Sequence, residues 1–358
     1  MDKVRVLVID DSNFNRDTIC EIFESHPRFE VVATASDGQM GLKMAMSVEP
    51  DLVTLDLEMP QMDGFTFLRL VMETRPVAVL VISSHSRPED VFTALDLGAV
   101  DFVAKSEHFF PGEISRTLRD EILLKAEAAS AARRLQAPAT QPSLKPTRSP
   151  SVEDADGDPA LLRRIACIGA STGGPRAVRA LVEGLPPGGT TAYLVAQHMP
   201  RNFTATFADR LNRQSEVSVV EACHGDVVRP GCVYIAPGGT HMELVESEAG
   251  WQLALFEADY LDSYAPSVNR LFCSVAERYH GVALGIMLTG MGVDGRTGVE
   301  ALHRAGGHVV AESEETATVF GMPKEAISSG AVNEVLPLPK IVDRLSKFGR
   351  GEGVRSEP

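Results

Sequence analysis

A glycine-rich turn in the second half of the chain contains a serine that could act as a nucleophile. Residues 169–173 read GASTG and fit the G-x-S-x-G turn, which lifts a serine, here Ser171, above the edge of a sheet. The same turn could cradle a phosphate instead, because free N–H groups at a helix N-terminus bind anions. The five residues leave both uses open, so the rest of the chain must decide between them.

A nucleophilic serine needs a base, and it needs an acid that orients the base. His198, in AQHMP, follows the next apolar run and is expected at the same sheet edge, while His241, in YIAPGGTHM, is the second candidate. Asp294 lies in LTGMGVDG after a further apolar run, where it could equally cap the following helix. We expect Ser171, His198 and Asp294 to form a triad. Their order differs from that of α/β-hydrolases, which argues against that fold.

A second polar cluster is expected in the first half of the chain. Asp10 and Asp11 end the first apolar run, and Asp56 ends the third. Three carboxylates at one edge of a parallel sheet repel one another unless a divalent cation lies among them, and Mg²⁺ prefers such oxygen ligands. Ser83 and Lys105 end two further runs, and a hydroxyl and an ammonium suit a transferred phosphoryl group. A single aspartate here is usually a helix cap, but the five groups together predict a phosphorylation site.

Both clusters require parallel sheets, and the chain alternates in the way that builds them. Residues 1–125 alternate apolar runs with amphipathic helical stretches five times, which predicts one doubly wound (βα)5 domain. Residues 126–160 are rich in alanine and then in proline, serine and threonine, and they predict an extended linker. Residues 161–350 predict a second, mostly parallel α/β domain with an antiparallel ribbon around 233–256.

Composition excludes several classes of protein. The chain has 358 residues, 44% of them hydrophobic, which is enough for two cores. A formal net charge of −15 argues against nucleic-acid binding. The chain has no apolar run of about 18 residues for membrane insertion, and the N-terminus does not resemble a signal peptide. The five cysteines form no C-x-x-C pair, so we expect a cytoplasmic protein without a zinc site.

The motifs VLVIDDS, DLVTLDLEMPQMDG, VISS and DFVAK resemble the response-regulator receiver domain over about residues 3–125. The resemblance implies Mg²⁺ between three carboxylates, Asp10, Asp11 and Asp56. It also implies that Asp56 accepts a phosphoryl group from a histidine kinase, and that three residues respond to it: Ser83, Phe102 and Lys105. Ser106 stands where the family usually has proline, which puts the loop after Lys105 in question.

The motifs IGASTGGP, AQHMP, YIAPGGTHM, SYAPSVNRLFCSVAE, LTGMGVDG and TATVFGMPKEAI resemble the catalytic domain of chemotaxis protein-glutamate methylesterases, the CheB family, over about 163–346. The resemblance implies a serine hydrolase that removes methyl esters from glutamyl side chains of methyl-accepting chemoreceptors, releasing methanol. It also implies deamidation of receptor glutamines, with no cofactor for ester hydrolysis. Thr172 would support the nucleophile, and the backbone near Met291 would stabilise the oxyanion. Asn269 stands where the family often has aspartate.

The receiver–linker–esterase order implies that phosphorylation controls the enzyme. An unmodified receiver would restrict access to the esterase, and phosphorylation of Asp56 would shift that equilibrium. The competing class is a binding module without catalytic activity, which would use residues 169–173 to hold a phosphate or a partner. Such a module leaves His198 and Asp294 at matching strand ends unexplained.

Overall fold

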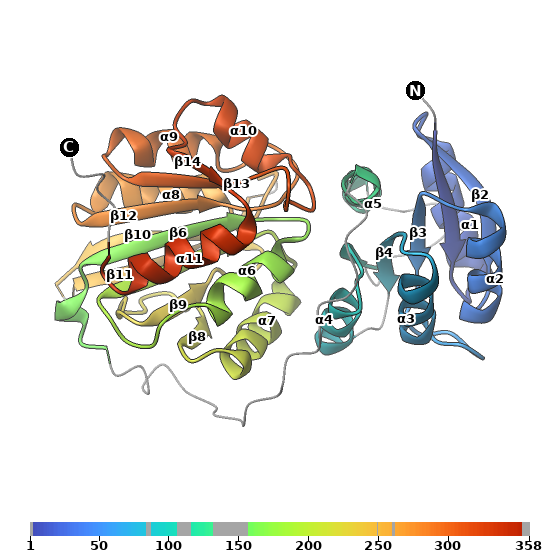
Figure 1. Cartoon of the computed structure of the whole chain (residues 1–358), viewed down its shortest axis with the longest axis horizontal. Coiled ribbons are helices and arrows are strands. Elements are labelled where there is room, and N and C mark those ends of the chain that lie inside the picture. The colour runs from blue at the N-terminus through green and yellow to red at the C-terminus, as the bar shows by residue number, and fades with distance from the viewer. Residues whose placement is uncertain are drawn as a thin grey trace. The chain divides into compact units, whose positions relative to one another are not determined.

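The computed structural model of the chain describes residues 3–83, 87–105, 116–131, 157–248, 250–259 and 262–352. The chain divides into two compact units, residues 1–141 and 142–358, and each unit has a parallel sheet of its own (Figure 1). The expectation of two doubly wound α/β domains is confirmed. Within the described ranges, every helix is too short or too polar to cross a membrane.

The N-terminal unit has a five-stranded parallel sheet in the order β2-β1-β3-β4-β5. Its strands are β1 (Val4–Ile9), β2 (Phe29–Ala35), β3 (Leu52–Leu55), β4 (Ala78–Ser83) and β5 (Asp101–Ala104). Its helices are α1 (Asn13–Glu24), α2 (Gly38–Val48), α3 (Gly64–Thr74), α4 (Pro88–Asp96) and α5 (Arg116–Ala131). Because β1 lies between β2 and β3, the strand order reverses there, and ligands bind such sheets beyond the C-terminal ends of these strands.

Side chains at the helix starts explain where three of these helices begin. Ser12, Asp37 and Asp63 precede α1, α2 and α3, and each accepts a hydrogen bond from a backbone N–H in the first turn. Such caps satisfy donors that have no partner within the helix. Each helix therefore begins directly after the loop that follows its strand, which leaves the strand ends free for polar residues.

The predicted linker begins inside a helix. α5 continues to Ala131, and both Ala126 and Ala129 are buried in the core beneath it. Alanine is the strongest helix former and allows close packing, so the alanine-rich stretch that suggested a linker belongs to α5 up to this point. Residues 132–156 lie outside the described residues. At the far end, a short 3₁₀ turn, η2 (Pro159–Leu161), leads into the second unit.

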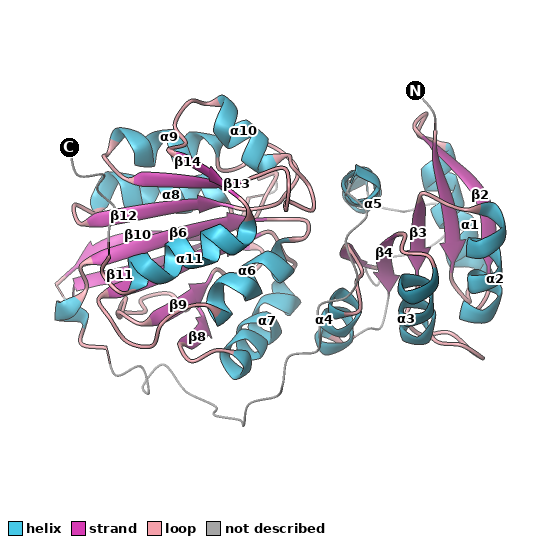
Figure 2. Cartoon of the chain, viewed as in Figure 1, coloured by secondary structure: helices cyan, strands magenta, loops and turns pink. Residues whose placement is uncertain are grey.

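The C-terminal unit has a seven-stranded parallel sheet in the order β14-β13-β12-β6-β7-β9-β8. Its strands are β6 (Arg164–Ala170), β7 (Thr191–Gln197), β8 (Ser218–Glu221), β9 (Cys232–Ile235), β12 (Val282–Met287), β13 (His308–Glu312) and β14 (Glu334–Leu336). Its helices are α6 (Gly174–Glu183), α7 (Arg201–Gln214), α8 (Val268–Arg278), α9 (Arg296–Arg304), α10 (Met322–Ser328) and α11 (Leu338–Gly349). Figure 2 shows α6, α7 and α11 on one face of the sheet and α8 and α9 on the other.

The antiparallel ribbon lies slightly later in the chain than predicted. It pairs β10 (Thr240–Ser247) with β11 (Gly250–Glu257), whereas the prediction began at residue 233. The run 232–235 is instead β9, whose four residues are all buried, as expected for a strand of a covered parallel sheet. β14 was not predicted, because it has only three residues and none of them is fully buried.

The turn between β6 and α6 requires a glycine, and a matched pair of variants tests this. Gly173 and Gly330 both have φ of 76°, but a Cβ at Gly173 would lie 2.5 Å from Thr318 Cβ, whereas Gly330 faces open space. We expect Gly330→Ala to lower the free energy of unfolding by about 1 kcal/mol through backbone strain. Gly173→Ala should lower it by about 1–3 kcal/mol more through overpacking.

Urea unfolding followed by tryptophan fluorescence measures this difference. The only tryptophan of the chain, Trp251, lies in β11 and therefore reports on the C-terminal unit alone. Equal losses for the two variants would contradict the packing argument.

Candidate functional site

Ser171 follows β6 directly and lies in the turn that opens α6. Its backbone N–H donates to the carbonyl of Thr289, at 3.0 Å, in the loop after the neighbouring strand β12. Gly290 comes so close that a Cβ there would lie 2.8 Å from the Cβ of Ser171. Gly173, with φ of 76°, turns the chain into the helix. The serine is thus presented at the C-terminal edge of the sheet, beside the loop that contains Met291 and Asp294.

His198 follows β7, which pairs with β6, so the predicted base lies one strand away from the predicted nucleophile. Its backbone N–H donates to the carbonyl of Ala170 at 3.0 Å. The buried side chain of Gln197 donates from Nε2 to the carbonyls of Ser171, at 2.9 Å, and of His198, at 3.0 Å. One amide group therefore ties together the two strand ends that carry these residues.

Asp294 lies beside His198 in the structure, with 2.9 Å between Oδ2 and Nε2 of the imidazole. The carboxylate also accepts from the Ser267 hydroxyl and from the backbone N–H groups of Val268 and Asn269, at 2.7–3.0 Å. Asp294 therefore caps α8, and not the helix that follows it, which begins after Gly295. Burial would raise the pKa of Asp294, but these hydrogen bonds hold it below its ordinary value.

The contact with Asp294 also decides which nitrogen of His198 can act as a base. Because an ionised carboxylate only accepts, Nε2 carries the proton of a neutral ring and Nδ1 keeps its lone pair. Nδ1 is buried and has no hydrogen-bond partner among the described residues. Tyr264 stacks on the ring with 4.6 Å between centroids and an interplanar angle of 11°. The structure brings Ser171 and His198 to adjacent strand ends without a hydrogen bond between their side chains.

Thr172 follows Ser171 in the turn after β6, and Met291 lies in the loop after β12. Thr172 is buried, and its carbonyl accepts from the hydroxyl of Thr289 at 2.9 Å. Thr289 is fixed in turn by Glu312, whose Oε2 accepts from its backbone N–H at 2.8 Å, and burial raises the pKa of Glu312. Met291 follows Gly290 in the same loop and is half-buried.

Five residues of this site were not predicted from the sequence as functional: Gln197, Tyr264, Ser267, Thr289 and Glu312. Four of them lie inside or directly beside the motifs that carry the family resemblance, and Glu312 ends a strand whose neighbour is β12. For Gln197, Thr289 and Glu312 the available signal was a polar residue at a strand end, as it was for Asp294, whereas Tyr264 and Ser267 had no such signal. Asn269, the departure from the family pattern, accepts from the N–H of Gly298 through Oδ1 at 2.8 Å and joins α8 to α9.

The predicted phosphorylation site assembles at the C-terminal edge of the N-terminal sheet. Lys105 Nζ lies 2.6 Å from Asp10 Oδ2 and 2.7 Å from Asp56 Oδ2, and the Ser83 hydroxyl donates to Asp56 Oδ1 at 2.9 Å. Asp11 is exposed, and one carboxylate oxygen from each of the three aspartates lies within 4.8 Å of the others. Burial raises the pKa of Asp10, while Lys105 opposes that shift. This donor set suits a hard divalent cation such as Mg²⁺.

Phe102 lies inward, with 2% of its surface exposed. Lys125 of α5 donates to its carbonyl at 2.6 Å, and the same ammonium lies 5.0 Å from the centroid of the ring. The third predicted switch residue is therefore in contact with the last helix of its own unit. Ser106, the other departure from the family pattern, lies outside the described residues.

The lowered pKa of Asp294 predicts a pH dependence of stability. A carboxyl group with a lower pKa in the folded state stabilises that state when ionised. This stabilisation is complete above the ordinary pKa of 3.8 and is lost as the pH falls through the lower folded value. We therefore expect the C-terminal unit to lose stability more steeply in wild type than in Asp294→Asn below about pH 4. Trp251 fluorescence measures this, and the exposed Asp209→Asn should retain the wild-type slope. A wild-type slope in Asp294→Asn would contradict the assignment.

Two family models match the chain. The model described as "CheB methylesterase" matches residues 166–345, and the model described as "Response regulator receiver domain" matches residues 6–111. The predicted resemblance to both families is confirmed. The two matches agree with the two units, since each model lies within one of them.

Relatives match over nearly the whole length of the chain. The "Protein-glutamate methylesterase/protein-glutamine glutaminase 1" of Myxococcus xanthus is 49% identical over 348 residues, which cover 97% of each chain. A relative named in the same way from Geobacter sulfurreducens is 45% identical, over 97% of this chain and 96% of its own. The crystal structure of the Thermotoga maritima CheB methylesterase catalytic domain matches with a TM-score of 0.50 and 40% identity, over 52% of this chain and 98% of that one. The chain therefore belongs to the CheB methylesterase family, with a response-regulator receiver domain before the catalytic domain.

Proposed function

We propose that the chain hydrolyses γ-methyl esters of glutamyl side chains in chemoreceptors, with Ser171 as the nucleophile. The observation that carries the proposal is the 2.9 Å contact between His198 and Asp294, one strand away from Ser171. A module that used residues 169–173 only to bind a phosphate would not need a histidine–carboxylate pair at this edge. The names of the full-length relatives support the same activity.

We assign each residue a step in the reaction. Nδ1 of His198 takes the proton of Ser171 as Oγ attacks the ester carbonyl, and Asp294 stabilises the resulting imidazolium through Nε2. Backbone N–H groups at Thr172 and Met291 stabilise the oxyanion, which contributes about 3 kcal/mol. The intermediate collapses, the bond to the methoxy oxygen breaks, and His198 returns the proton to release methanol. Water then hydrolyses the acyl-enzyme by the same proton transfers and leaves a glutamate.

The same acyl-enzyme forms from a glutamine side chain, with ammonia as the leaving group. Because His198 protonates the departing atom in either case, no further residue is needed for deamidation. The relatives carry "protein-glutamine glutaminase" in their names. We therefore assign both activities to the site that contains Ser171.

In the receiver, Asp56 accepts the phosphoryl group from a histidine kinase. Asp10, Asp11 and Asp56 would hold Mg²⁺, which neutralises charge on the phosphoryl oxygens when it is bound. Lys105 already contacts the acceptor carboxylate and can follow the added charge, while Ser83 can donate to a phosphoryl oxygen instead of Asp56. A histidine kinase as phosphodonor and five free thiols suit the reducing cytoplasm.

Phosphorylation controls the esterase by shifting a conformational equilibrium. The unmodified receiver restricts access to the catalytic unit, and the new charge at Asp56 redirects Ser83 and Lys105 and releases Phe102 from its inward position. The contact of Lys125 with Phe102 links this change to α5, the helix that ends the receiver.

Replacement of the nucleophile tests the esterase. We expect Ser171→Ala to abolish methanol release from methylated chemoreceptor, because no other group can form the acyl-enzyme. Ser328→Ala, on the exposed surface of α10, should retain the wild-type rate. Gas chromatography of released methanol measures both, with a small phosphodonor present. Wild-type hydrolysis by Ser171→Ala would overturn the triad.

Replacement of the acceptor tests the receiver. Asp56→Asn should not incorporate phosphate from acetyl phosphate, because an amide cannot form the acyl phosphate. Removal of Mg²⁺ with EDTA should have the same effect on wild type, while Asp17→Asn on α1 should be phosphorylated normally. Electrophoresis with a phosphate-binding gel separates the two forms. Phosphorylated Asp56→Asn would mean that another residue is the acceptor.

A further inference from the structure

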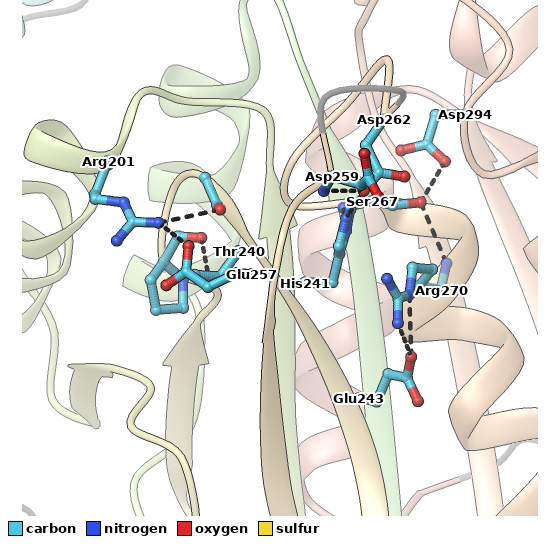
Figure 3. A network of polar contacts seen from close by, with 12 residues as sticks. Arg201, Thr240, His241, Glu243, Glu257, Asp259, Asp262, Ser267, Arg270 and Asp294 are labelled. Atoms are coloured by element: carbon cyan, nitrogen blue, oxygen red, sulfur yellow. Dashed lines mark hydrogen bonds and ion pairs between the residues drawn. The ribbon is translucent and has the colours of Figure 1, made fainter.

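His241, the second candidate for the base, forms a histidine–carboxylate pair of its own. Its side chain is 0% exposed, and Nε2 lies 2.9 Å from Oδ2 of Asp262 (Figure 3). Nδ1 accepts a hydrogen bond from the backbone N–H of Ser267 at 3.2 Å. Since both ring nitrogens are engaged and the ring is buried, His241 is not placed to take a proton from a substrate or from Ser171.

The tautomer of His241 follows from its two partners. The N–H of Ser267 can only donate, so Nδ1 carries a lone pair and the proton of the neutral ring lies on Nε2. Asp262 accepts that proton, and its Oδ2 also accepts from the N–H of Asp259 at 2.7 Å. The hydrogen bond from His241 lowers the pKa of Asp262. Asp262 therefore keeps His241 in the one form that can accept from Ser267.

Ser267 connects this pair to the candidate active site. Its hydroxyl accepts from the N–H of Arg270, at 3.3 Å, and donates to Asp294, at 3.0 Å. The next two backbone N–H groups, of Val268 and Asn269, donate to Asp294 as well. Three consecutive residues at the start of α8 thus hold the carboxylate, and the first of them is bonded to His241. A shift of the backbone at Ser267 moves all three donors.

The remainder of α8 is attached to β10 without His241. Arg270 makes two hydrogen bonds to Glu243, at 2.7 and 3.0 Å (Figure 3). The hydroxyl of Ser274 accepts from the N–H of Leu244 at 2.9 Å. These contacts lie further along the helix and anchor it to the ribbon. His241 acts only at the N-terminal end, where Asp294 is bound, so its replacement leaves the helix in place.

We propose that His241 is a positioning residue for the hydrolase reaction: it fixes Ser267 through Nδ1 and so holds Asp294 in its contact with His198. Asp262 supports it by fixing its tautomer. The proposal rests on the proposed function, since it gives His241 a part in the reaction of Ser171, His198 and Asp294.

Two variants separate the acceptor at Nδ1 from the rest of the ring. His241→Asn can place its amide oxygen near the position of Nδ1, whereas His241→Gln reaches the position of Nε2 and leaves Ser267 without an acceptor. We expect His241→Gln to lower kcat by about 10- to 100-fold with KM for methylated chemoreceptor unchanged. His241→Asn should stay within about threefold of wild type. His303→Gln, exposed on α9, is the matched control and should not change either constant.

A spectroscopic measurement on the full-length chain reports on the same geometry without turnover. The imidazole N–H bonded to Asp294 gives a downfield ¹H resonance, which His198→Ala identifies by its loss. It should move in His241→Gln and remain in place in His241→Asn. Equal kcat losses in the two variants, or an unmoved resonance in His241→Gln, would overturn the proposal.

The proposal can still be tested if a His241 variant fails to fold. If His241→Gln does not fold, as judged by Trp251 fluorescence, Asp262→Ala replaces it, because Asp262 is one-third exposed and its truncation removes the acceptor at Nε2 while the ring stays in place. It should lower kcat with KM unchanged, and wild-type kcat would overturn the proposal. Ser171→Ala is measured in parallel. Activity in Ser171→Ala refutes the proposed function itself, whereas an inactive Ser171→Ala beside unaffected His241 variants refutes only the positioning role.

Discussion

The catalytic unit depends on the burial of one negative charge, the carboxylate of Asp294. A buried carboxylate costs several kcal/mol unless hydrogen bonds replace the water that it has lost. Here the replacement comes from three consecutive residues at the start of α8 and from His198 after β7, and the carboxylate itself lies in the loop before α9. Satisfying the charge therefore fixes three separate segments relative to one another. The orientation of the imidazole is one result of that requirement.

The carboxylates of the receiver have surroundings that differ from those of Asp294. Asp10 and Asp56 share a single ammonium, that of Lys105, and Asp11 remains exposed beside them. Burial raises the pKa of Asp10 although Lys105 opposes that shift, whereas hydrogen bonds lower the pKa of Asp294 in spite of its burial. A partly compensated cluster can take up a cation and a phosphoryl group, while a fully compensated carboxylate keeps one geometry. The two units thus apply the same electrostatics to a switch and to a fixed catalytic site.

The sequence predicted those features that follow from periodicity and strand ends. Ser171, His198 and Asp294 each follow an apolar run, and parallel strands bring such positions to one edge, so their proximity could be predicted. Tyr264 and Ser267 could not be predicted in this way, because they lie between the ribbon and α8, and only tertiary packing brings that segment to His198. The predicted ribbon began too early in the chain for a related reason. An apolar run does not reveal whether the strand that it forms pairs with its neighbour in parallel or in antiparallel fashion. The linker was predicted to begin at residue 126, inside α5, because alanine is common both in linkers and in helices.

The hydrogen bonds of Thr289 restrict which substitutions this site can accept. Its carbonyl accepts from Ser171, its hydroxyl donates to Thr172 and accepts from Val319, and its N–H is bonded to Glu312. Only a residue with a hydroxyl can donate and accept at this point, so valine, which has the same shape, would leave two buried groups without partners. A mutation of Glu312 in β13 can therefore affect the backbone of Ser171 through two hydrogen bonds. The turn that holds Ser171 is constrained by buried residues of neighbouring strands as well as by its own glycines.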